Sequence, residues 1–348
     1  MGISGLLQYL KDYLVSTNIR MYSGQIAAVD ISCWIHQGAY YADFSCGAEG
    51  VVQKIINYIT KRIRMLVELN IEPIIVFDGA NISAKQRILD ERAKNRFNSR
   101  EKSLHLMMEG RSEEANKKFG QSFTITRYLV SRILKVIKGN WWKYVIAPYE
   151  ADPQLAYLYK SGKVSIVITE DSDLIPYGVS KILYKMDNKG DGYELDMSKL
   201  YSSQARNWES TLISKLFTEN SLNKITSILT INNSEWIDWD KLKSDQDCQL
   251  SNEAWMKFNS KSENCGPLFN KDSFLSIWIL AGWDYLAPIK GIGFKTAHKL
   301  IEEHGTIDNA LKVICKTSKY IVPKDYIEGF NRAYLTFLFQ VVYDPDLK

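Results

Sequence analysis

The sequence predicts an α/β fold, with a mostly parallel central sheet flanked by helices. Short, β-branched apolar segments recur along the chain, and stretches with helical periodicity separate them. Continuous apolar strands that alternate with helices are typical of parallel sheets covered on both faces. With 348 residues, 45% of them hydrophobic, the chain is long and apolar enough for a large buried core.

Four strands are expected in order along the chain, at "QIAAVD", "EPIIVFD", "KYVIAP" and "SIVIT". Helices are expected between them, for example at "GVVQKIINYITKRIRMLVEL" and "EADPQLAYLYKSG". Acidic residues end or closely follow every one of these strands: Asp30, Asp78, Glu150, Asp152, Asp171 and Asp173. Since ligands bind beyond the carboxyl ends of parallel strands, the fold would gather these acids at one edge of the sheet.

Each of these acids, taken alone, has an ordinary structural explanation. Glu150 and Asp152 could stabilise the start of the following helix, and Asp78 with Gly79 could form a turn. Carboxylates gathered at one edge, however, repel one another unless cations neutralise them. No His or Cys set accompanies the acids, and oxygen ligands suit hard cations such as Mg²⁺ or Mn²⁺. Two such cations, about 4 Å apart, are a standard device for in-line displacement at phosphorus.

The basic residues are concentrated in one segment, although the net charge is only +4. Residues 79–138 hold 14 Lys and Arg against 6 Asp and Glu, a net charge of +8, which leaves −4 for the remainder. This asymmetry favours a polyanionic partner. Within "AKQRILDERAKNRFNSREKSL", Lys85, Arg92 and Arg96 would lie in one stripe of a helix and could grip a phosphate. A solvated helix face is the alternative.

A second candidate for phosphate binding is "IKGIGFKTAHKL". Gly291 and Gly293 allow close approach of the backbone, and a helical pattern with Lys295 follows. An ordinary turn between two helices is the default interpretation of a lone Gly-x-Gly. Just upstream, Asp284 in "GWDYL" could be a seventh acid of the cluster, although its spacing alone does not establish this.

The cysteine pattern and the apolar runs predict a soluble intracellular protein. The five cysteines are odd in number, widely spaced and without a Cys-x-x-Cys pair, which favours reduced thiols over a disulfide frame or a zinc site. No apolar run approaches the ~18 residues that a membrane helix requires. The first residues, "MGISGLLQYLKDYL", are too polar for a signal peptide.

Several segments resemble the flap-endonuclease superfamily of 5′ nucleases: "MGISGLLQYL", "AAVDISCWIHQGA", "PIIVFDG", "VIAPYEADPQLAYL", "VITEDSDLIPYG", "AGWDYL" and "IKGIGFKTAHKL". The resemblance covers about residues 1–200 and 269–346, and it is greater to the exonuclease branch than to the flap endonucleases themselves. It implies a single nuclease domain over residues 1–348 with a PIN-like 5′-nuclease fold. A helical arch is expected at about 80–138 and a helix-two-turn-helix motif, which binds DNA, at about 273–320.

The resemblance also implies roles for individual residues. All seven acids stand where the family has its metal-site acids, and none is missing, which argues against an inactive relative. Lys85 and Arg92 are implied to contact the scissile phosphate. The residues implied to contact DNA are Gly2, His36, Arg96, Gly291, Gly293 and Lys295. The glycine turn is also where family members commonly hold a K⁺ ion.

Two departures from the family pattern stand out. Ser32 occupies a position where relatives of the exonuclease branch often carry a Tyr that packs on the substrate nucleotide, so this stacking contact is lost or supplied elsewhere. Residues 202–268 replace what is a short connection in relatives, and they are rich in Asn, Ser and Lys. We expect this insert to be disordered, with at most one short helix at "STLISKLFTENSLNKI".

The expected function is therefore a Mg²⁺-dependent DNA nuclease with a two-metal mechanism. It would act as a 5′→3′ exonuclease on duplex ends, nicks and gaps, and it would cleave 5′ flaps, in DNA repair. A dedicated flap endonuclease, a non-catalytic DNA-binding scaffold and an RNA-cutting nuclease are the alternatives. We expect a nuclear monomer without a membrane partner; mismatch-repair proteins are conceivable partners, but no motif here specifies them.

Overall fold

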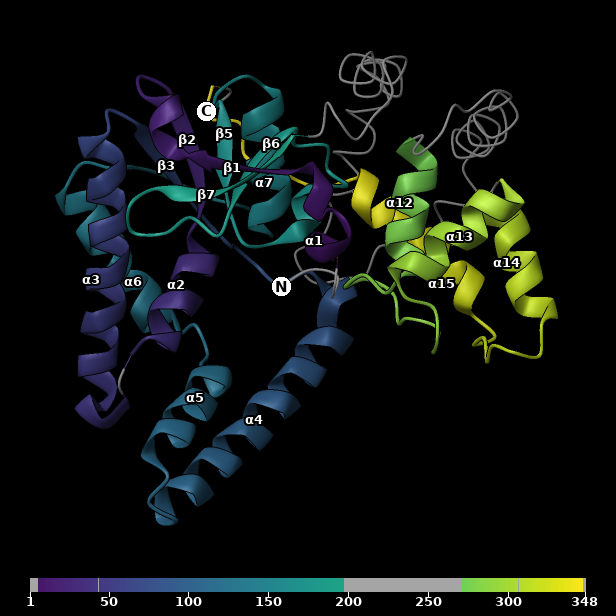
Figure 1. Ribbon diagram of the computed structural model, residues 1–348, viewed down its shortest axis with the longest axis horizontal. Helices are drawn as coiled ribbons and strands as arrows, with labels where there is room; N and C mark the ends of the chain where they lie inside the picture. The colour runs from purple at the N-terminus through teal and green to yellow at the C-terminus, as the bar shows by residue number, and fades with distance from the viewer. Residues whose placement is uncertain (1–5, 43, 197–270, 306, 347–348) are drawn as a thin grey trace, which may run out of the picture. The chain divides into compact units, whose positions relative to one another are not determined.

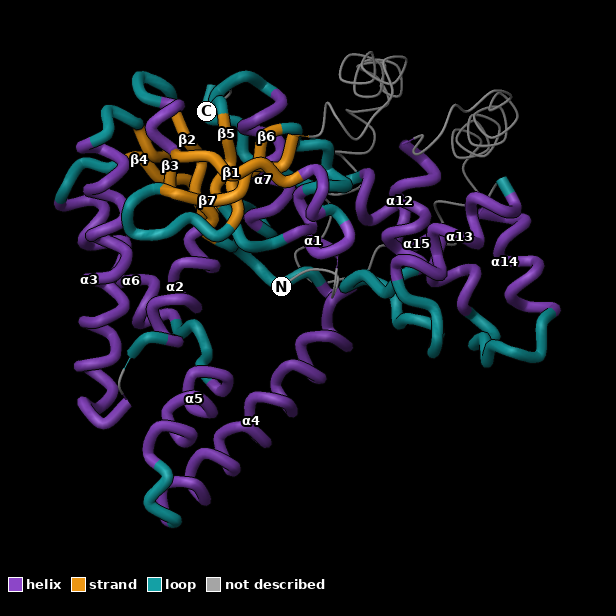
Figure 2. The backbone as a smooth tube through the Cα atoms, in the orientation of Figure 1, coloured by secondary structure: helices purple, strands orange, loops and turns teal. Residues whose placement is uncertain are grey.

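The computed structural model describes residues 6–42, 44–196, 271–305 and 307–346, and it shows an α/β fold (Figure 1). Seven strands form one sheet in the order β1-β7-β6-β5-β2-β3-β4 (Figure 2). The strands are β1 (Leu14–Asn18), β2 (Ile26–Asp30), β3 (Glu72–Phe77), β4 (Lys143–Ile146), β5 (Ile166–Ile168), β6 (Lys181–Tyr184) and β7 (Asp191–Asp196). The predicted insert at 202–268, including its proposed short helix, lies outside the described residues.

The described helices precede, separate and follow the strands. They are α1 (Leu6–Tyr9), α2 (Ile31–Tyr40), α3 (Gly47–Glu68), α4 (Gln86–Met108), α5 (Ser112–Ser122), α6 (Arg127–Gly139), α7 (Ala151–Lys160), α12 (Lys271–Leu280), α13 (Phe294–His304), α14 (Ile307–Lys316) and α15 (Tyr326–Leu338). None of them is both long and apolar enough to span a membrane. The three described cysteines, Cys33, Cys46 and Cys315, form no disulfide.

The sheet is mostly parallel, as predicted. Strands β2 to β6 pair in parallel, and β7 joins β6 and β1 through antiparallel pairs. The four predicted strands correspond to β2, β3, β4 and β5. The other three, β1, β6 and β7, were not predicted. Of these, β1 and β7 are polar or alternating segments that pair antiparallel at one side of the sheet.

Both faces of the central strands are buried, which explains their continuous apolar sequences. Val29 and Ile75 point into a core shared with α2, α3 and α6. Their neighbours Ala28 and Val76 are equally buried but belong to the opposite face, because side chains alternate along a strand. Helix α7 contacts β2, β3 and β5. The carboxyl ends of these strands are thereby held rigidly at one edge.

Gly79 fixes the end of β3 against the loop that precedes α7. A Cβ atom at this position would lie 1.9 Å from the carbonyl oxygen of Ala147, so only glycine fits. The close approach permits hydrogen bonds from the Gly79 N–H to the Tyr149 carbonyl (2.5 Å) and from the Ala80 N–H to the Pro148 carbonyl (3.0 Å). As a result, Asp78 lies directly beside the start of α7.

The predicted basic helix is present, but Lys85 lies directly before it and not within it. Lys85 ends a 3-10 turn, Ser83–Lys85, and α4 starts at Gln86. The prediction that Lys85 lies in the same helical stripe as Arg92 and Arg96 is therefore wrong in detail. Lys85 is turned inward and is only 8% exposed, because the carboxylates of Glu150 and Asp284 bind its ammonium group.

The last segment of the chain is anchored to α7. The side chain of Gln154, which is fully buried, accepts a hydrogen bond from the Tyr343 N–H (2.7 Å) and donates one to the Tyr343 carbonyl (2.8 Å). Lys163, just beyond α7, forms ion pairs with Asp344 and Asp346. Residues 343–346 thus brace the helix whose first turn carries Asp152.

Candidate metal centre

Three of the predicted acids form a compact cluster at the carboxyl edge of the sheet. Asp152 lies in the first turn of α7, and Asp171 and Asp173 lie in the loop that follows β5. One carboxylate oxygen of each lies within 4.8 Å of the others, a spacing at which they could share a metal ion. Asp171 also accepts a hydrogen bond from the Asp173 N–H (3.1 Å), which fixes the loop that carries both residues.

Asp30 lies at the end of β2 and is almost completely buried. Its carboxylate accepts hydrogen bonds from the Ser32 N–H (3.0 Å), the Thr169 hydroxyl (2.8 Å) and the Cys33 thiol (2.9 Å). The first of these makes Asp30 the N-cap of α2. Burial raises the pKa of the Cys33 thiol well above its usual value, so this thiol acts as a proton donor and not as a nucleophile.

Asp78 follows β3 and is more exposed than Asp30. One of its oxygens accepts a hydrogen bond from the Ala151 N–H at 2.9 Å. The other accepts one from the Ser32 hydroxyl at 2.6 Å. The Ala151 contact is at the N-terminus of α7, where backbone N–H groups lack partners within the helix.

Burial and mutual repulsion raise the pKa values of the clustered acids. Burial and the neighbouring carboxylates of Asp171 and Asp284 raise the pKa of Asp173 to about 8. Burial and Asp78 raise that of Asp30 to about 6. Burial and the neighbouring acids also raise the pKa of Asp152 well above its usual value. The cluster thus lacks sufficient positive charge of its own.

One oxygen of the cluster is buried without any hydrogen-bond partner in the described part of the chain. It is Oδ1 of Asp173, whose Oδ2 accepts a hydrogen bond from the Trp283 indole N–H at 2.8 Å. A buried carboxylate oxygen without a donor is costly unless a cation binds it. The orphaned oxygen, the three converging carboxylates and the absence of His or Cys ligands among them fit a hard divalent cation.

Two predicted cations meet the remaining acids. The ammonium group of Lys85 lies 2.7 Å from Glu150 and 3.1 Å from Asp284. Arg92 donates from one nitrogen to both oxygens of Asp284 at 2.8 Å. Burial opposes the charge of Lys85, but Glu150 and Asp284 together raise its pKa above the usual value. Lys85 is therefore cationic, and Glu150 forms this ion pair instead of capping α7.

The segment Trp283–Tyr285 closes the site, and only its aspartate was predicted. Besides the bond from Trp283 to Asp173, the Tyr285 hydroxyl donates to Glu150, and the Lys85 ammonium lies over the Tyr285 ring at 5.0 Å. The sequence signal that could have identified both aromatic residues is their position on either side of Asp284. Ser32, Thr169 and Cys33, which bind Asp30 or Asp78, were not predicted in this role either.

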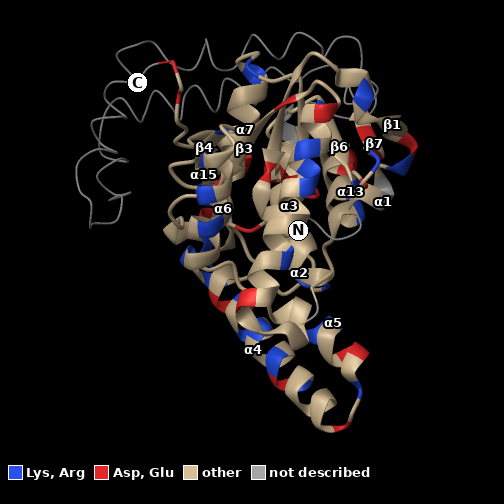
Figure 3. Cartoon of the chain, turned by 90° about the vertical axis from the view of Figure 1, so that its left-hand side faces the viewer, with Lys and Arg blue, Asp and Glu red and all other residues tan. Residues whose placement is uncertain are grey.

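The residues predicted to contact DNA are placed outside the acidic cluster. His36 is exposed on α2 and its ring lies edge-to-face with that of Phe123, with 6.3 Å between centroids. Arg96 lies on α4, along which both basic and acidic residues recur (Figure 3). Gly291 has φ +90°, which favours glycine, and Gly293 directly precedes α13, whose first turn contains Lys295. Gly2 lies outside the described residues.

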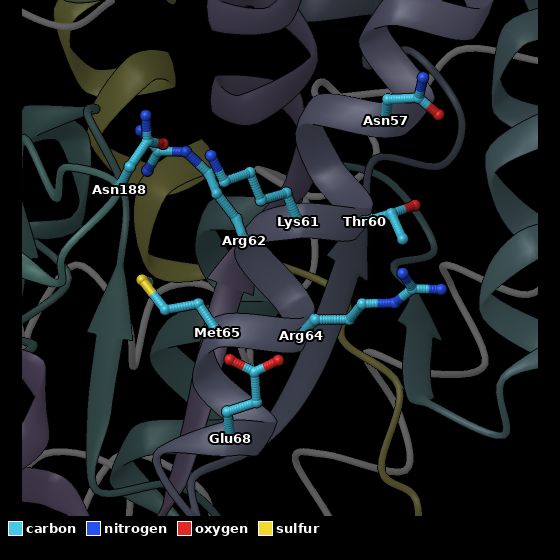
Figure 4. A pocket seen from close by; sticks show the side chains of 8 residues that line it. All are labelled: Asn57, Thr60, Lys61, Arg62, Arg64, Met65, Glu68 and Asn188. Carbon is cyan, nitrogen blue, oxygen red and sulfur yellow. The ribbon is translucent and has the colours of Figure 1, made fainter.

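A basic pocket of about 430 Å³ lies between α3 and the turn that joins β6 to β7 (Figure 4). Its lining includes Lys61, Arg62, Arg64 and Asn188, with one acid, Glu68. Arg62 is only 6% exposed; it donates to the Met186 carbonyl at 2.6 Å, while its Nε has no partner in the described part of the chain. Sequence reasoning missed this pocket because its three cations all lie on α3, and the turn that forms its other wall is distant in the sequence.

Comparison with known families identifies two regions of the chain. The XPG N-terminal domain matches residues 1–99, and the XPG I-region matches residues 142–245. The first match contains Asp30 and Asp78, and the second contains Glu150, Asp152, Asp171 and Asp173.

Individual relatives agree with these matches. The chain is 32% identical to Exonuclease 1 of Danio rerio over 99% of its own length, but it spans only 36% of that relative. The catalytic core of Rad2 in complex with DNA substrate is 16% identical, with a TM-score of 0.59 over 100% of this chain and 89% of that one. The Holliday junction-resolving enzyme GEN1, in complex with product DNA and Mg²⁺, is 15% identical, with a TM-score of 0.54 over 99% and 66%. At these identities the structural matches show a shared fold.

Proposed function

Since this chain belongs to the family defined by the XPG N-terminal domain and the XPG I-region, and is similar to Exonuclease 1, we propose that it is a structure-specific, Mg²⁺-dependent DNA nuclease. It would hydrolyse phosphodiester bonds as a 5′→3′ exonuclease on duplex ends, nicks and gaps, and it would cleave 5′ flaps. The observation that carries the proposal is the cluster of Asp152, Asp171 and Asp173, with its orphaned oxygen, beside two cations that are able to bind phosphate.

Most of the residues proposed to hold the metal ions follow the carboxyl ends of the sheet strands, which we call the acidic edge. Asp284 is joined to this edge through Lys85, which pairs with both Asp284 and Glu150. The proposed ligands are Asp30, Asp78, Glu150, Asp152, Asp171, Asp173 and Asp284. Two Mg²⁺ ions, for which Mn²⁺ may be substituted experimentally, would activate water and neutralise charge at the phosphoryl group. The side-chain bonds from Ser32 to Asp78, from Thr169 to Asp30 and from Trp283 to Asp173 hold three of these carboxylates in place before any ligand arrives.

Lys85 and Arg92 are proposed to bind and orient the scissile phosphate. In this structure both are paired with carboxylates, Lys85 with Glu150 and Asp284, and Arg92 with Asp284. A phosphate that enters between them and the acids would exchange these partners for its own oxygens. Because cations positioned on the phosphoryl group stabilise the charge that develops in the transition state, both residues should act mainly on the chemical step.

Contacts with duplex DNA are proposed at several places outside the acidic edge. Arg96 and His36 would meet DNA near the acids, and Gly2 would lie close to the substrate. The turn at Gly291 and Gly293, with Lys295, would bind the duplex backbone through N–H groups, and its carbonyl groups could hold a K⁺ ion. The basic pocket at Arg62 offers a further place for a backbone phosphate. We further propose that the protein acts as a monomer, in the nucleus, in DNA repair.

A dedicated flap endonuclease is the second candidate, because the same acids and cations serve either reaction. The two are separated with a recessed 5′-end duplex, a nick and a 5′ flap, each labelled at the 5′ end and incubated with Mg²⁺ or with EDTA. Single nucleotides released from the duplex and the nick support the exonuclease. Intact flaps with little attack on plain ends support the flap endonuclease.

The same assay tests the two remaining alternatives. DNA binding without any Mg²⁺-dependent product would support a non-catalytic scaffold and contradict the proposal. Preferred cleavage of an RNA version of one hairpin over its DNA version would support an RNA-cutting nuclease. Asp173→Ala, purified in parallel, controls for a contaminating nuclease.

A further inference from the structure

Ser32 connects two acids that end neighbouring strands of the sheet. It lies in the first turn of α2 and is only 9% exposed. Its N–H donates to Asp30 at 3.0 Å, and its hydroxyl donates to Asp78 at 2.6 Å. Asp30 ends β2 and Asp78 follows β3, and these two strands pair in parallel. One residue is thus bonded to the carboxylates of both strand ends.

The two acids depend on Ser32 to different degrees. Asp30 is buried and accepts further hydrogen bonds from Thr169 and Cys33. Asp78 is exposed, and in the described part of the chain its carboxylate has one donor besides the Ser32 hydroxyl, the Ala151 N–H at 2.9 Å. Loss of the hydroxyl would therefore leave the carboxylate of Asp78 with one hydrogen bond instead of two, on one oxygen only. Asp30 would keep all of its hydrogen bonds, because Ser32 binds it through the backbone N–H.

The hydrogen bond leaves Asp78 able to bind a cation. Each carboxylate oxygen has two lone pairs, and Ser32 and Ala151 occupy one on each oxygen. Two donors on different oxygens fix the plane of the carboxylate and the direction of the remaining lone pairs. Outer partners that orient a metal ligand in this way typically contribute 10–100-fold to metal affinity or activity.

We propose that Ser32 is a positioning residue that holds the carboxylate of Asp78 in the orientation required for binding a divalent cation at the acidic edge. This inference rests on the proposed function, because it concerns the cation of the same site. It also assigns a task to the residue that replaces the stacking Tyr of the exonuclease branch. The short serine side chain reaches Asp78 from within α2 and serves the metal centre.

Mn²⁺ binding to the full chain in the absence of DNA, followed by electron paramagnetic resonance, tests the inference apart from catalysis. Ser32→Ala should bind Mn²⁺ about 10-fold more weakly than the unmodified protein. Ser32→Thr, which keeps the hydroxyl, should bind Mn²⁺ nearly normally. Ser32→Val has the same shape as Ser32→Thr but lacks the hydroxyl, and it should bind Mn²⁺ as weakly as Ser32→Ala. In single-turnover cleavage, the defect of Ser32→Ala should shrink as Mn²⁺ is raised.

A matched control removes another buried serine hydroxyl. Ser103→Ala deletes a hydrogen bond to the Ala115 carbonyl, between α4 and α5, and should leave Mn²⁺ affinity unchanged. Melting temperatures with EDTA verify that every variant is folded; if Ser32→Ala is not, the Thr and Val pair carries the test.

The possible outcomes separate the inference from the proposed function. If the unmodified protein binds no Mn²⁺, the proposed function fails and the inference falls with it. If it binds Mn²⁺ and Ser32→Ala or Ser32→Val binds equally well, the inference alone is wrong. A folded Ser32→Thr that binds as weakly as Ser32→Val also contradicts it, because the hydroxyl would then not be the determinant.

Discussion

The carboxyl edge of the sheet and helix α4 both carry charged residues of the candidate site, but they hold them differently. At the edge, Asp30, Asp171 and Asp173 are buried, and each lies at or just beyond the end of a strand of the buried sheet. In α4 only Ser103 is buried, and the helix packs mainly against α5. The acids are thus positioned by the core, whereas Lys85 and Arg92, at the start of α4, are positioned by the acids themselves.

This difference predicts that substitutions at the edge reduce catalysis far more than DNA affinity, and with the largest effect. Asp173→Ala should reduce the single-turnover cleavage rate by at least about 10²–10³-fold, because a charge-stabilising contact is lost from the reaction centre. DNA affinity, measured by fluorescence anisotropy, should change little, since the acids repel phosphate. Asp78→Ala should behave in the same way. A mutant that keeps a substantial fraction of the rate would contradict the metal assignment.

The cations at the start of α4 should show an intermediate effect. Lys85→Ala and Arg92→Ala should slow single-turnover cleavage by about 10²-fold, with smaller losses of DNA affinity, because both are proposed to orient the phosphate in the transition state. Rates at saturating DNA, combined with anisotropy titrations, separate the two effects. A drop in affinity with an unchanged rate would show that these residues only bind DNA.

The buried acids should also make the metal-free protein sensitive to pH. The pKa of Asp173 is raised to about 8 in the folded chain, so its contribution to stability is complete below its unfolded pKa, near 3.8, and is lost as pH rises through about 8. In EDTA, the melting temperature should therefore fall between about pH 5 and about pH 8. Mg²⁺ should oppose the fall, and increasingly so at higher pH, because it binds the charged carboxylates.

Asp173→Asn provides the matched control for this pH dependence, since it has nearly the same shape and does not titrate. Its melting temperature in EDTA should fall less between the same two pH values. Identical slopes for Asp173→Asn and the unmodified protein would show that this carboxyl group is not responsible.

The smallest effect is expected further along α4. Arg96 is partly exposed and is proposed to contact a DNA phosphate. Arg96→Ala should weaken DNA binding uniformly across sequences and reduce the slope of log affinity against log salt by about 0.9, the value for one phosphate contact. Anisotropy titrations over a series of salt concentrations measure that slope. An unchanged slope would place Arg96 outside the DNA interface and would leave Lys85 and Arg92 as the site's proposed phosphate ligands on this segment.

The sequence by itself determined the class of the fold and the position of most acids. Continuous apolar segments revealed β2 to β5, because strands buried on both faces leave no polar alternation. The acids Asp152, Asp171 and Asp173 could be expected to meet, since the ends of parallel strands share one edge. The family motifs were equally readable, because they are local in sequence.

Only the tertiary structure decided which groups complete the site. Strands β1, β6 and β7, the inward turn of Lys85 and the bonds made by Ser32, Trp283 and Tyr285 depend on residues far apart in the chain. The bond from Trp283 to Asp173 spans 110 positions, and that from Ser32 to Asp78 spans 46. Periodicity and spacing report local structure, whereas a hydrogen bond between distant segments exists only after the core has packed and brought its donor and acceptor together.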